Sequence, residues 1–341
     1  MSKKKIVRIV IILLSALLIV GGIVTFILID HYYRLINYRE AEELVVTEPF
    51  APTPEPILPI VEKAEPTPTP VPNDPLSSRD VYNILLLGTD ARWDGYNSRT
   101  DTMMLVSINK KTKQISLVSF LRDTYIWIHD YGYQRLNVAN IVGGPGNLIA
   151  TLEENYGVKI DNYAFVNFYS FMDVVDVLGG VDVAMSNTEV YCANEWVYDP
   201  ELQVDWSRRE AIEYNEEGLY HLTGIQALAF CRTRSIAGDT GRTEQQRRVI
   251  TALWDKVRDI SIADGTAILT TVLPQITSDI SMDTCIALLM TLANYHDYTV
   301  VQQQIPADGT FNFATIAEMS VVQADFEANQ VLLQELLYGE S

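Results

Sequence analysis

The chain has 341 residues, 48% of them hydrophobic, and a formal net charge of −19 at pH 7. This length suits one large domain with accessory segments, and the apolar content is enough for a sizeable core. The negative charge excludes nucleic acid and anionic lipid surfaces as general partners, because a polyanion repels other polyanions, so any basic site must be local.

The start of the chain is predicted to be a single-pass anchor in the cell membrane. Residues Ile9–Ile29 carry no charge, and a helix of this length spans about 31 Å, roughly one bilayer hydrocarbon core. Three lysines and Arg8 precede this run, so residues 1–8 are expected in the cytoplasm and everything after His31 outside the cell. A cleaved signal peptide is the alternative, but the run is too long and lacks a small-residue cleavage site.

Residues 30–80 are predicted to connect this anchor to an extracellular domain over residues 81–341. The first part, Asp30–Val46, is expected to be a short juxtamembrane helix. The stretch Pro49–Pro75 holds ten of the 14 prolines, and such a composition favours an extended polyproline conformation that buries no core. At about 3.1 Å per residue, this stretch would hold the domain several tens of ångströms from the membrane.

Strands and helices alternate through the exported part, which predicts a single α/β sandwich domain with a helix-covered central sheet. A buried strand is expected at Tyr82–Leu87, followed by a hairpin of strands at Asp101–Ile108 and Gln114–Phe120. Gly143–Gly146 is a weak lookalike of a phosphate loop and is expected to punctuate a helix instead. Further strands are predicted at Tyr163–Phe168, Val181–Ala184 and Tyr298–Gln304, and helices at Leu148–Tyr156, Phe171–Leu178, Leu222–Cys231, Arg242–Val257, Ala267–Ile276, Asp283–Ala293 and Ala324–Leu337.

Two aspartates occupy the ends of the first two strands. Asp90 follows the first strand and Asp101 begins the second, so both carboxylates emerge at one end of the sheet if the strands are neighbours. Two carboxylates without a nearby His or Cys suit a hard cation such as Mg²⁺. Aspartate is also common in turns, and the pattern alone does not choose between the two interpretations.

Arginines gather in two later motifs. Arg122 and Asp123 follow the strand that ends at Phe120, and Arg242 and Gln246 share a helix face four residues apart. The second of these motifs also contains Arg232, Arg234 and Asp239, and Asp239 has a structural alternative as the N-cap of the helix.

Lysine is nearly absent from the same region. Between Gln114 and Asp255 there are nine arginines and one lysine, Lys159. Guanidinium offers a planar, bidentate fork for phosphate oxygens, so this bias favours a phosphate site over a solvated surface. Ordinary salt bridges are the alternative, and Arg247 and Arg248 are expected to lie, one or both, on a solvated helix face.

In their order, these motifs resemble those of the LytR-CpsA-Psr family of cell-wall glycopolymer ligases. The segments GTDAR, RTDTM, LRDT, LGGVDV, LTGIQALAFCRTR and GDTGRTEQQRRV fall within residues 82–252. The resemblance implies a hydrophobic pocket for a polyprenyl chain and a divalent ion, Mg²⁺ or Mn²⁺, held through Asp90 and Asp101. It also implies pyrophosphate-binding roles for Arg99, Arg122, Arg232, Arg234, Arg242 and Gln246. The sequence departs from the family pattern at Cys231 and Gln245, where an apolar residue and an arginine are more usual.

The reaction implied by the resemblance is a phosphotransfer. A glycopolymer would leave a polyprenyl-pyrophosphate carrier and join a hydroxyl of peptidoglycan, with arginines and the metal neutralising phosphate oxygens. Arg122 would be catalytic, together with Asp123 or Asp239 as the carboxylate that orients or deprotonates the acceptor. Two rivals use the same site: a pyrophosphatase that takes water as acceptor, and an envelope regulator that binds the lipid without turnover.

Two groups of residues leave open questions. Cys192 and Cys231 are candidates for a disulfide, with three free thiols as the alternative. Phe165, Phe168, Phe171 and Met172 are candidates for a tail pocket, but an aromatic stripe is more typical of a core.

Overall fold

The structure is a computed structural model that describes residues 27–41, 75–89, 99–199, 202, 204–215, 218–233, 238–258, 270–292 and 297–339. Most of the expected membrane span, residues 9–26, and the proline-rich stretch up to residue 74 lie outside these ranges. No helix within the described ranges is both long and apolar enough to cross a bilayer.

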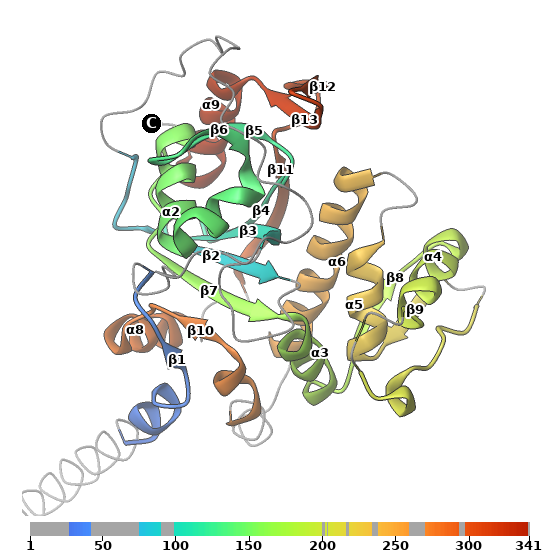
Figure 1. Ribbon diagram of the computed structural model, residues 1–341. Coiled ribbons are helices and arrows are strands. Elements are labelled where there is room, and N and C mark those ends of the chain that lie inside the picture. Colours follow the sequence, from blue (N-terminus) through green and yellow to red (C-terminus); the bar gives the residue numbers. More distant parts are fainter. Residues whose placement is uncertain are drawn as a thin grey trace, which may run out of the picture.

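A mixed seven-stranded sheet, in the order β1-β10-β7-β2-β3-β4-β11, forms the centre of the domain (Figure 1). The predicted hairpin is confirmed, because β3 pairs antiparallel with β4, and its other neighbour is β2, also antiparallel. Three pairs are parallel, β1 with β10, β2 with β7 and β4 with β11, and β10 runs antiparallel to β7. The strands are β1 (Asn37–Tyr38), β2 (Val81–Thr89), β3 (Thr100–Asn109), β4 (Gln114–Phe120), β7 (Asn162–Asn167), β10 (Thr277–Ser278) and β11 (Thr299–Ile305).

Helices cover both faces of this sheet, as the predicted α/β sandwich requires (Figure 1). On one face, α2 (Ala139–Tyr156) and α9 (Phe326–Tyr338) bury leucines against the strands, and these residues form the largest core cluster. On the other face, α6 (Gly238–Arg258) packs Ile250 and Trp254 against the sheet. The expected punctuation in α2 is confirmed, since Gly143 and Gly144 are non-helical and kink the helix.

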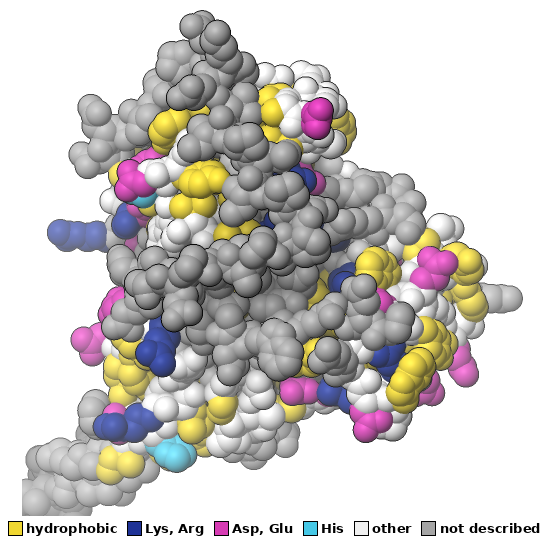
Figure 2. Space-filling view, viewed as in Figure 1, with side chains coloured by type: hydrophobic (Ala, Val, Ile, Leu, Met, Phe, Trp, Pro, Cys, Tyr) yellow, Lys and Arg dark blue, Asp and Glu magenta, His cyan; other side chains and the backbone are white. Residues whose placement is uncertain are grey.

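A smaller lobe extends beyond the end of the sheet (Figure 1) and has its own apolar core. Figure 2 shows apolar side chains over this part, where Tyr191, Trp206 and Tyr214 are exposed. The sequence predicted β8 but not β9. Leu222, which was expected to begin a helix, is instead the last residue of β9, and the helix starts only after Thr223. The elements are α3 (Phe168–Val177), β8 (Val181–Ala184), α4 (Asn187–Val197), η3 (Trp206–Arg208), β9 (Leu219–Leu222) and α5 (Gly224–Arg232).

Two small hairpins follow β4 and β11 in the chain, and the sequence analysis predicted neither. A bridge between Thr124 and Val322 joins them, and Tyr125, Met319 and Val321 form a shared buried cluster. These and the remaining elements are β5 (Tyr125–Ile128), β6 (Gly132–Arg135), η2 (Leu136–Val138), η4 (Leu273–Gln275), α8 (Met282–Leu292), β12 (Phe311–Ile316) and β13 (Met319–Ala324).

The segment after the expected membrane span differs from the helix predicted over Asp30–Val46. Helix continues only to Tyr33, and Asn37–Tyr38 then form β1, which pairs with β10 at the edge of the sheet. The N–H of Asn37 donates to the carbonyl of Ile276 at 3.1 Å, and that of Arg39 donates to Ser278 at 3.0 Å. Sheet pairing here satisfies backbone groups that a helix would otherwise have paired within itself, so tertiary structure overrides local preference.

Candidate functional site

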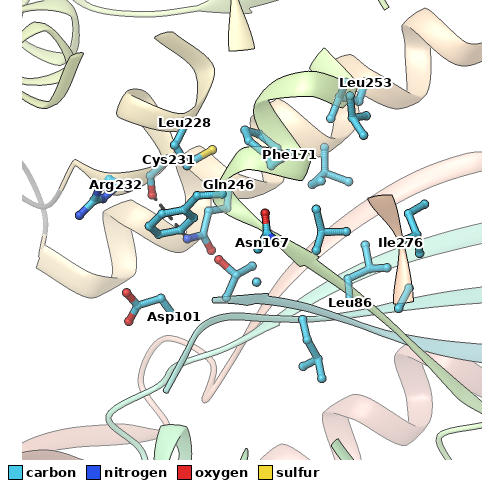
Figure 3. Close-up of a pocket in the computed structure, with 18 of the residues that line it drawn as sticks. Leu86, Asp101, Asn167, Phe171, Leu228, Cys231, Arg232, Gln246, Leu253 and Ile276 are labelled. Carbon is cyan, nitrogen blue, oxygen red and sulfur yellow. Dashed lines mark hydrogen bonds between the residues drawn. The ribbon is translucent and has the colours of Figure 1, made fainter. Parts of the chain in front are cut away.

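An apolar cavity of about 290 Å³ lies between the sheet and helices α3, α5 and α6 (Figure 3). Charged side chains, among them Asp101 and Arg232, line one end of the cavity, whereas Leu253 and Ile276 lie toward the other end (Figure 3). The cavity therefore has a polar end and an apolar end, an arrangement that suits an amphiphile with an anionic head.

Local sequence features shape the walls of this cavity. Gly88 lies where β2 passes close to β3, since a Cβ at this position would be only 3.0 Å from Cβ of Thr102. Asn167 ends β7 and caps α3, because its side chain accepts a hydrogen bond from the N–H of Ser170. The helix therefore begins at Phe168, whereas the sequence pattern predicts that this residue ends the strand. Phe168 and Phe171 both line the cavity.

Asp101 is the centre of the polar end. Nη1 of Arg122 donates to Oδ1 of Asp101 at 2.5 Å, and Nη1 of Arg242 lies 3.8 Å from the same oxygen. Nη2 of Arg242 also donates to the backbone carbonyl of Asp101 at 3.2 Å. Because the Arg242 side chain is only 3% exposed, its charge acts in a poorly solvated environment where electrostatic interactions are strong. Three residues predicted from three separate motifs therefore meet at one place.

Asp123 extends this charged group toward the small hairpins. Its Oδ2 lies 3.6 Å from Nε of Arg122, and its Oδ1 accepts from Nη1 of Arg135 at 3.4 Å. The backbone carbonyl of Asp123 accepts from the N–H of Val322, so β13 helps to fix its position. Asp123 therefore lies next to the arginine cluster, as a carboxylate acting on an acceptor hydroxyl would have to.

Arg232 is held by aromatic rings. Its guanidinium carbon lies 4.4 Å from the ring centroid of Trp196 and 4.9 Å from that of Phe168. Asp199 lies 3.7 Å from its Nη1. These contacts fix the guanidinium at the edge of the cavity, and cation–π contacts of this kind are worth about 0.5 to 2 kcal/mol each.

Arg242 and Gln246 line the cavity from a single face of α6, as their spacing predicted. Nε2 of Gln246 donates to the carbonyl of Cys231 at 3.4 Å, which joins α6 to α5. The N-cap alternative for Asp239 is wrong, because α6 begins at Gly238 and Asp239 lies within its first turn. The position and contacts of the Asp239 side chain are outside the described structure, so its catalytic role stays a prediction.

The expectation that Arg247 and Arg248 lie, one or both, on a solvated helix face is wrong. Arg247 is buried, and this burial lowers the pKa of its guanidinium. Arg248 is half-buried, with Nη1 donating to Glu189 at 2.6 Å and Nη2 donating to the carbonyl of Ala184. Helix α6 lies between the sheet and the lobe, so faces that would be solvated on an isolated helix are covered.

The remaining predicted residues are Asp90, Arg99 and Arg234. Asp90 and Arg234 lie outside the described residues, and Arg99 directly precedes β3. Within the described ranges, no three His, Cys, Asp or Glu side chains are grouped as a metal site. Asp101 offers the oxygen donor that a hard cation takes, and Thr89, the residue before Asp90, pairs with Thr100. The donor type and this register fit a divalent ion, and its binding stays a prediction.

The cysteines are free thiols, so the disulfide alternative is wrong. Cys231 lines the cavity, and burial raises its pKa to about 12, which keeps the thiol protonated and apolar. Of the four candidates for a tail pocket, Phe165 and Met172 belong to the packed core.

Three residues at the site were missed from the sequence: Arg135, Trp196 and Asp199. Trp196 lies in α4 and Asp199 soon after it, in a stretch for which no element was predicted, and Arg135 lies on a short hairpin. The predominance of arginine over lysine in this region included Arg135, and this was the one available signal.

Comparison with known proteins identifies similar sequences. The family model described as LytR_cpsA_psr matches residues 60–335. A polyisoprenyl-teichoic acid–peptidoglycan teichoic acid transferase TagU of Oceanobacillus iheyensis is 33% identical over 230 residues, covering 65% of this chain and 66% of the relative. The transferase TagT of Bacillus subtilis is 31% identical over 187 residues, covering 54% of this chain and 55% of the relative. The chain thus spans just under two thirds of the first relative and about half of the second.

Solved structures share the fold. A structure described as TagT bound to LI-WTA has a TM-score of 0.60 at 26% identity, with 76% of this chain and 91% of that chain covered. A protein from Streptococcus agalactiae, gbs0355, has a TM-score of 0.62 at 24% identity, with 76% and 89% covered, and shows the fold alone.

Proposed function

The chain belongs to the LytR-CpsA-Psr family, and from that premise we propose that it transfers a glycopolymer from a polyprenyl-pyrophosphate carrier onto peptidoglycan. The observation that carries the proposal is the cavity, which has Arg232 at one end and apolar side chains such as Leu253 and Ile276 toward the other (Figure 3). A lipid pyrophosphate likewise has an anionic head and an apolar tail. The relative from O. iheyensis is named as a transferase from polyisoprenyl-linked teichoic acid to peptidoglycan, which agrees with this donor and acceptor.

The proposed roles follow from the charges at the polar end. Arg122, Arg232 and Arg242 bind the pyrophosphate and stabilise the negative charge on the departing polyprenyl phosphate, since guanidinium groups in a poorly solvated site favour such charge strongly. Arg99, Arg234 and Gln246 complete this binding set. Asp123 or Asp239 orients the sugar hydroxyl and accepts its proton as the new phosphate ester bond forms.

A divalent ion is part of the proposal. Asp90 and Asp101 would hold Mg²⁺ or Mn²⁺, and the ion would supply additional neutralisation of the phosphate oxygens. The energy for transfer comes from the pyrophosphate bond, so the reaction needs no nucleotide outside the cell.

The proposed location is the outer face of the cell membrane, with Ile9–Ile29 as the single span and the N-terminus in the cytoplasm. Donor lipid and acceptor wall are both accessible from that side. The partners are then the membrane, the lipid-linked polymer and peptidoglycan.

The test is incubation of the purified full chain in detergent with a lipid-linked glycan, peptidoglycan fragments and Mg²⁺, followed by mass spectrometry of the products. We expect glycan joined to peptidoglycan through a phosphodiester, and loss of this product when the metal is chelated. Glycan phosphate released to water, with or without acceptor, would identify a pyrophosphatase instead. Bound but unconverted lipid would identify an envelope regulator.

A further inference from the structure

The segment that follows the expected membrane span is attached to the globular domain by a continuous series of contacts. We call Tyr33–Arg39 the docking segment. Besides the two backbone bonds of β1 to β10, Nδ2 of Asn37 donates to Oγ1 of Thr277 at 2.9 Å. The hydroxyl of Tyr33 donates to the carbonyl of Ile280 at 3.3 Å, and that of Tyr163 donates to the carbonyl of Arg39 at 2.8 Å.

The chain then enters the main core before the proline-rich stretch begins. Ala41 is buried in the same core cluster as Leu85 and Leu105 of the central strands. The chain is attached again at Leu76, whose N–H donates to Gly157 at 2.8 Å and whose carbonyl accepts from Lys159 at 3.0 Å. Both boundaries of residues 42–74 are therefore held by one folded body.

We infer that the docking segment seats the domain directly on the outer surface of the cell membrane, and that the proline-rich stretch does not separate the domain from the membrane. The inference rests on the proposed membrane anchor. From Ile29 to Tyr33 the chain is helical and advances only about 6 Å. A spacer made of the proline-rich stretch would allow roughly 80 Å. The domain is thus confined near the bilayer.

This attachment also orients the cavity. Ile276 lines its apolar end, and the carbonyl of the same residue accepts the N–H of Asn37 in the docking segment. In Figure 1 the helix that leads to Tyr33 leaves the domain beside β1 and β10. The apolar end of the cavity therefore lies on the membrane side of the domain and the arginines lie farther out. An isoprenoid lipid can then pass from the bilayer into the cavity with its tail toward the membrane.

The test uses the full chain in membrane vesicles, with the recognition sequence of a specific protease inserted between Ala64 and Glu65. After complete cleavage the membranes are sedimented and the domain fragment is measured in pellet and supernatant. We expect the fragment to stay in the pellet, because the docking segment holds it without a covalent link. Release of the fragment into the supernatant on cleavage alone would overturn the inference.

A matched pair of variants shows whether β1 is responsible. Replacing both Asn37 and Arg39 with Pro removes the two N–H groups that donate to β10, so cleavage should now release the fragment. Glu40→Pro, one residue beyond those donors, should leave it in the pellet. Retention of the fragment in the Asn37→Pro, Arg39→Pro variant would show that β1 does not hold the domain and would overturn the inference.

A cross-link tests the register while keeping the backbone hydrogen bonds of the strand. Asn37 and Thr277 are paired, so Asn37→Cys with Thr277→Cys should form a disulfide on mild oxidation and keep the cleaved fragment in the pellet even in urea. Failure to form it in folded protein would contradict the docking. Uncleaved chain that does not sediment with membranes would instead overturn the proposed anchor, so the two failures are distinguishable.

Discussion

The arginines at the polar end of the cavity are positioned by contacts that depend on the shape of the guanidinium group. Arg122 uses different nitrogens toward Asp101 and Asp123, and Arg232 lies over two aromatic rings. A lysine ammonium carries the same charge but has no planar fork and stacks less well on rings. The site therefore selects arginine for geometry as well as for charge.

Conservative replacement at these two positions should accordingly impair the reaction. We expect Arg122→Lys and Arg232→Lys each to lower the transfer rate by about tenfold or more, which corresponds to about 1.4 kcal/mol of transition-state stabilisation. Arg208→Lys is the control, because Arg208 forms ion pairs with Asp173 and Asp176 on the surface, away from the cavity lining. Rates within twofold or so of the control for both variants would contradict this role.

How far the site could be predicted depends on where each residue's partners come from. Asp101, Arg122 and Arg242 lie in motifs at ends of strands and on a helix face, and local pattern was enough to select them. The aromatic rings around Arg232 come from α3 and α4, two elements that meet only in the folded chain. The prediction that Arg247 is solvated failed for the same reason. Other elements of the fold bury it, and the periodicity of its own helix does not reveal them.

Among the secondary-structure elements, the crossing of α3 and α5 defines one wall of the cavity. The helices approach so closely at Gly224 that an added Cβ would lie 2.1 Å from the carbonyl oxygen of Met172 and 2.7 Å from its carbonyl carbon. Backbone atoms cannot move aside as a flexible side chain can. Both helices supply lining residues, so their separation fixes the width of the cavity.

Gly224→Ala should therefore affect both stability and lipid binding. We expect a loss of about 1 to 3 kcal/mol in the free energy of unfolding, the usual cost of overpacking, and weaker binding of a polyprenyl pyrophosphate. Gly179→Ala is the control, because its left-handed backbone (φ 75°) is strained by a side chain but nothing lies within 4 Å. Denaturant unfolding and lipid titration of both variants check this, and unchanged lipid binding in Gly224→Ala would show that the crossing does not control the cavity.

Long apolar strands and amphipathic helices were predicted well, and short elements were not. The runs that form β2, β3 and β4 and the helices α6 and α8 have clear periodicity or continuous apolar character. β1 and β10 have only two residues each, and they form strands because they pair with each other in the folded chain. The hairpins β5–β6 and β12–β13 likewise depend on mutual packing.

Considering the whole molecule, the lobe is joined to the main body partly through a half-buried ion pair. Nη1 of Arg248 on α6 lies 2.6 Å from Oε1 of Glu189 on α4, and the Glu189 side chain is only 15% exposed. Burial alone would raise the pKa of Glu189, but hydrogen bonds from Arg248 and Ser186 outweigh it and hold the pKa below its ordinary value. The pair therefore stabilises the folded state fully above the ordinary glutamate pKa, and this contribution is lost as pH falls through the lower, folded value.

We expect Glu189→Gln to lower the free energy of unfolding by about 1 to 2 kcal/mol near neutral pH. The difference from the unchanged protein should shrink as the pH is lowered from about 7 to about 3, because protonation then removes the same charge from Glu189 itself. Glu213→Gln, on an exposed stretch of the lobe, is the control and should have little effect at any pH. A deficit that persists undiminished in acid would mean that the charge of Glu189 is not what joins the lobe.

The sheet brings together segments from distant parts of the chain, and this has a consequence for the order of events during synthesis. Asn37 bonds to a residue 240 positions later, and Asn83 bonds to one 255 positions later. Such a chain has a high contact order, so its central sheet cannot be completed until almost all of the polypeptide has emerged. Until then β4 and β7 lack their late partners β11 and β10, and edge strands of this kind invite wrong pairing. Folding is therefore completed only when the end of the chain is available, and loss of the last helix, α9, would remove one of the helices that cover one face of the sheet.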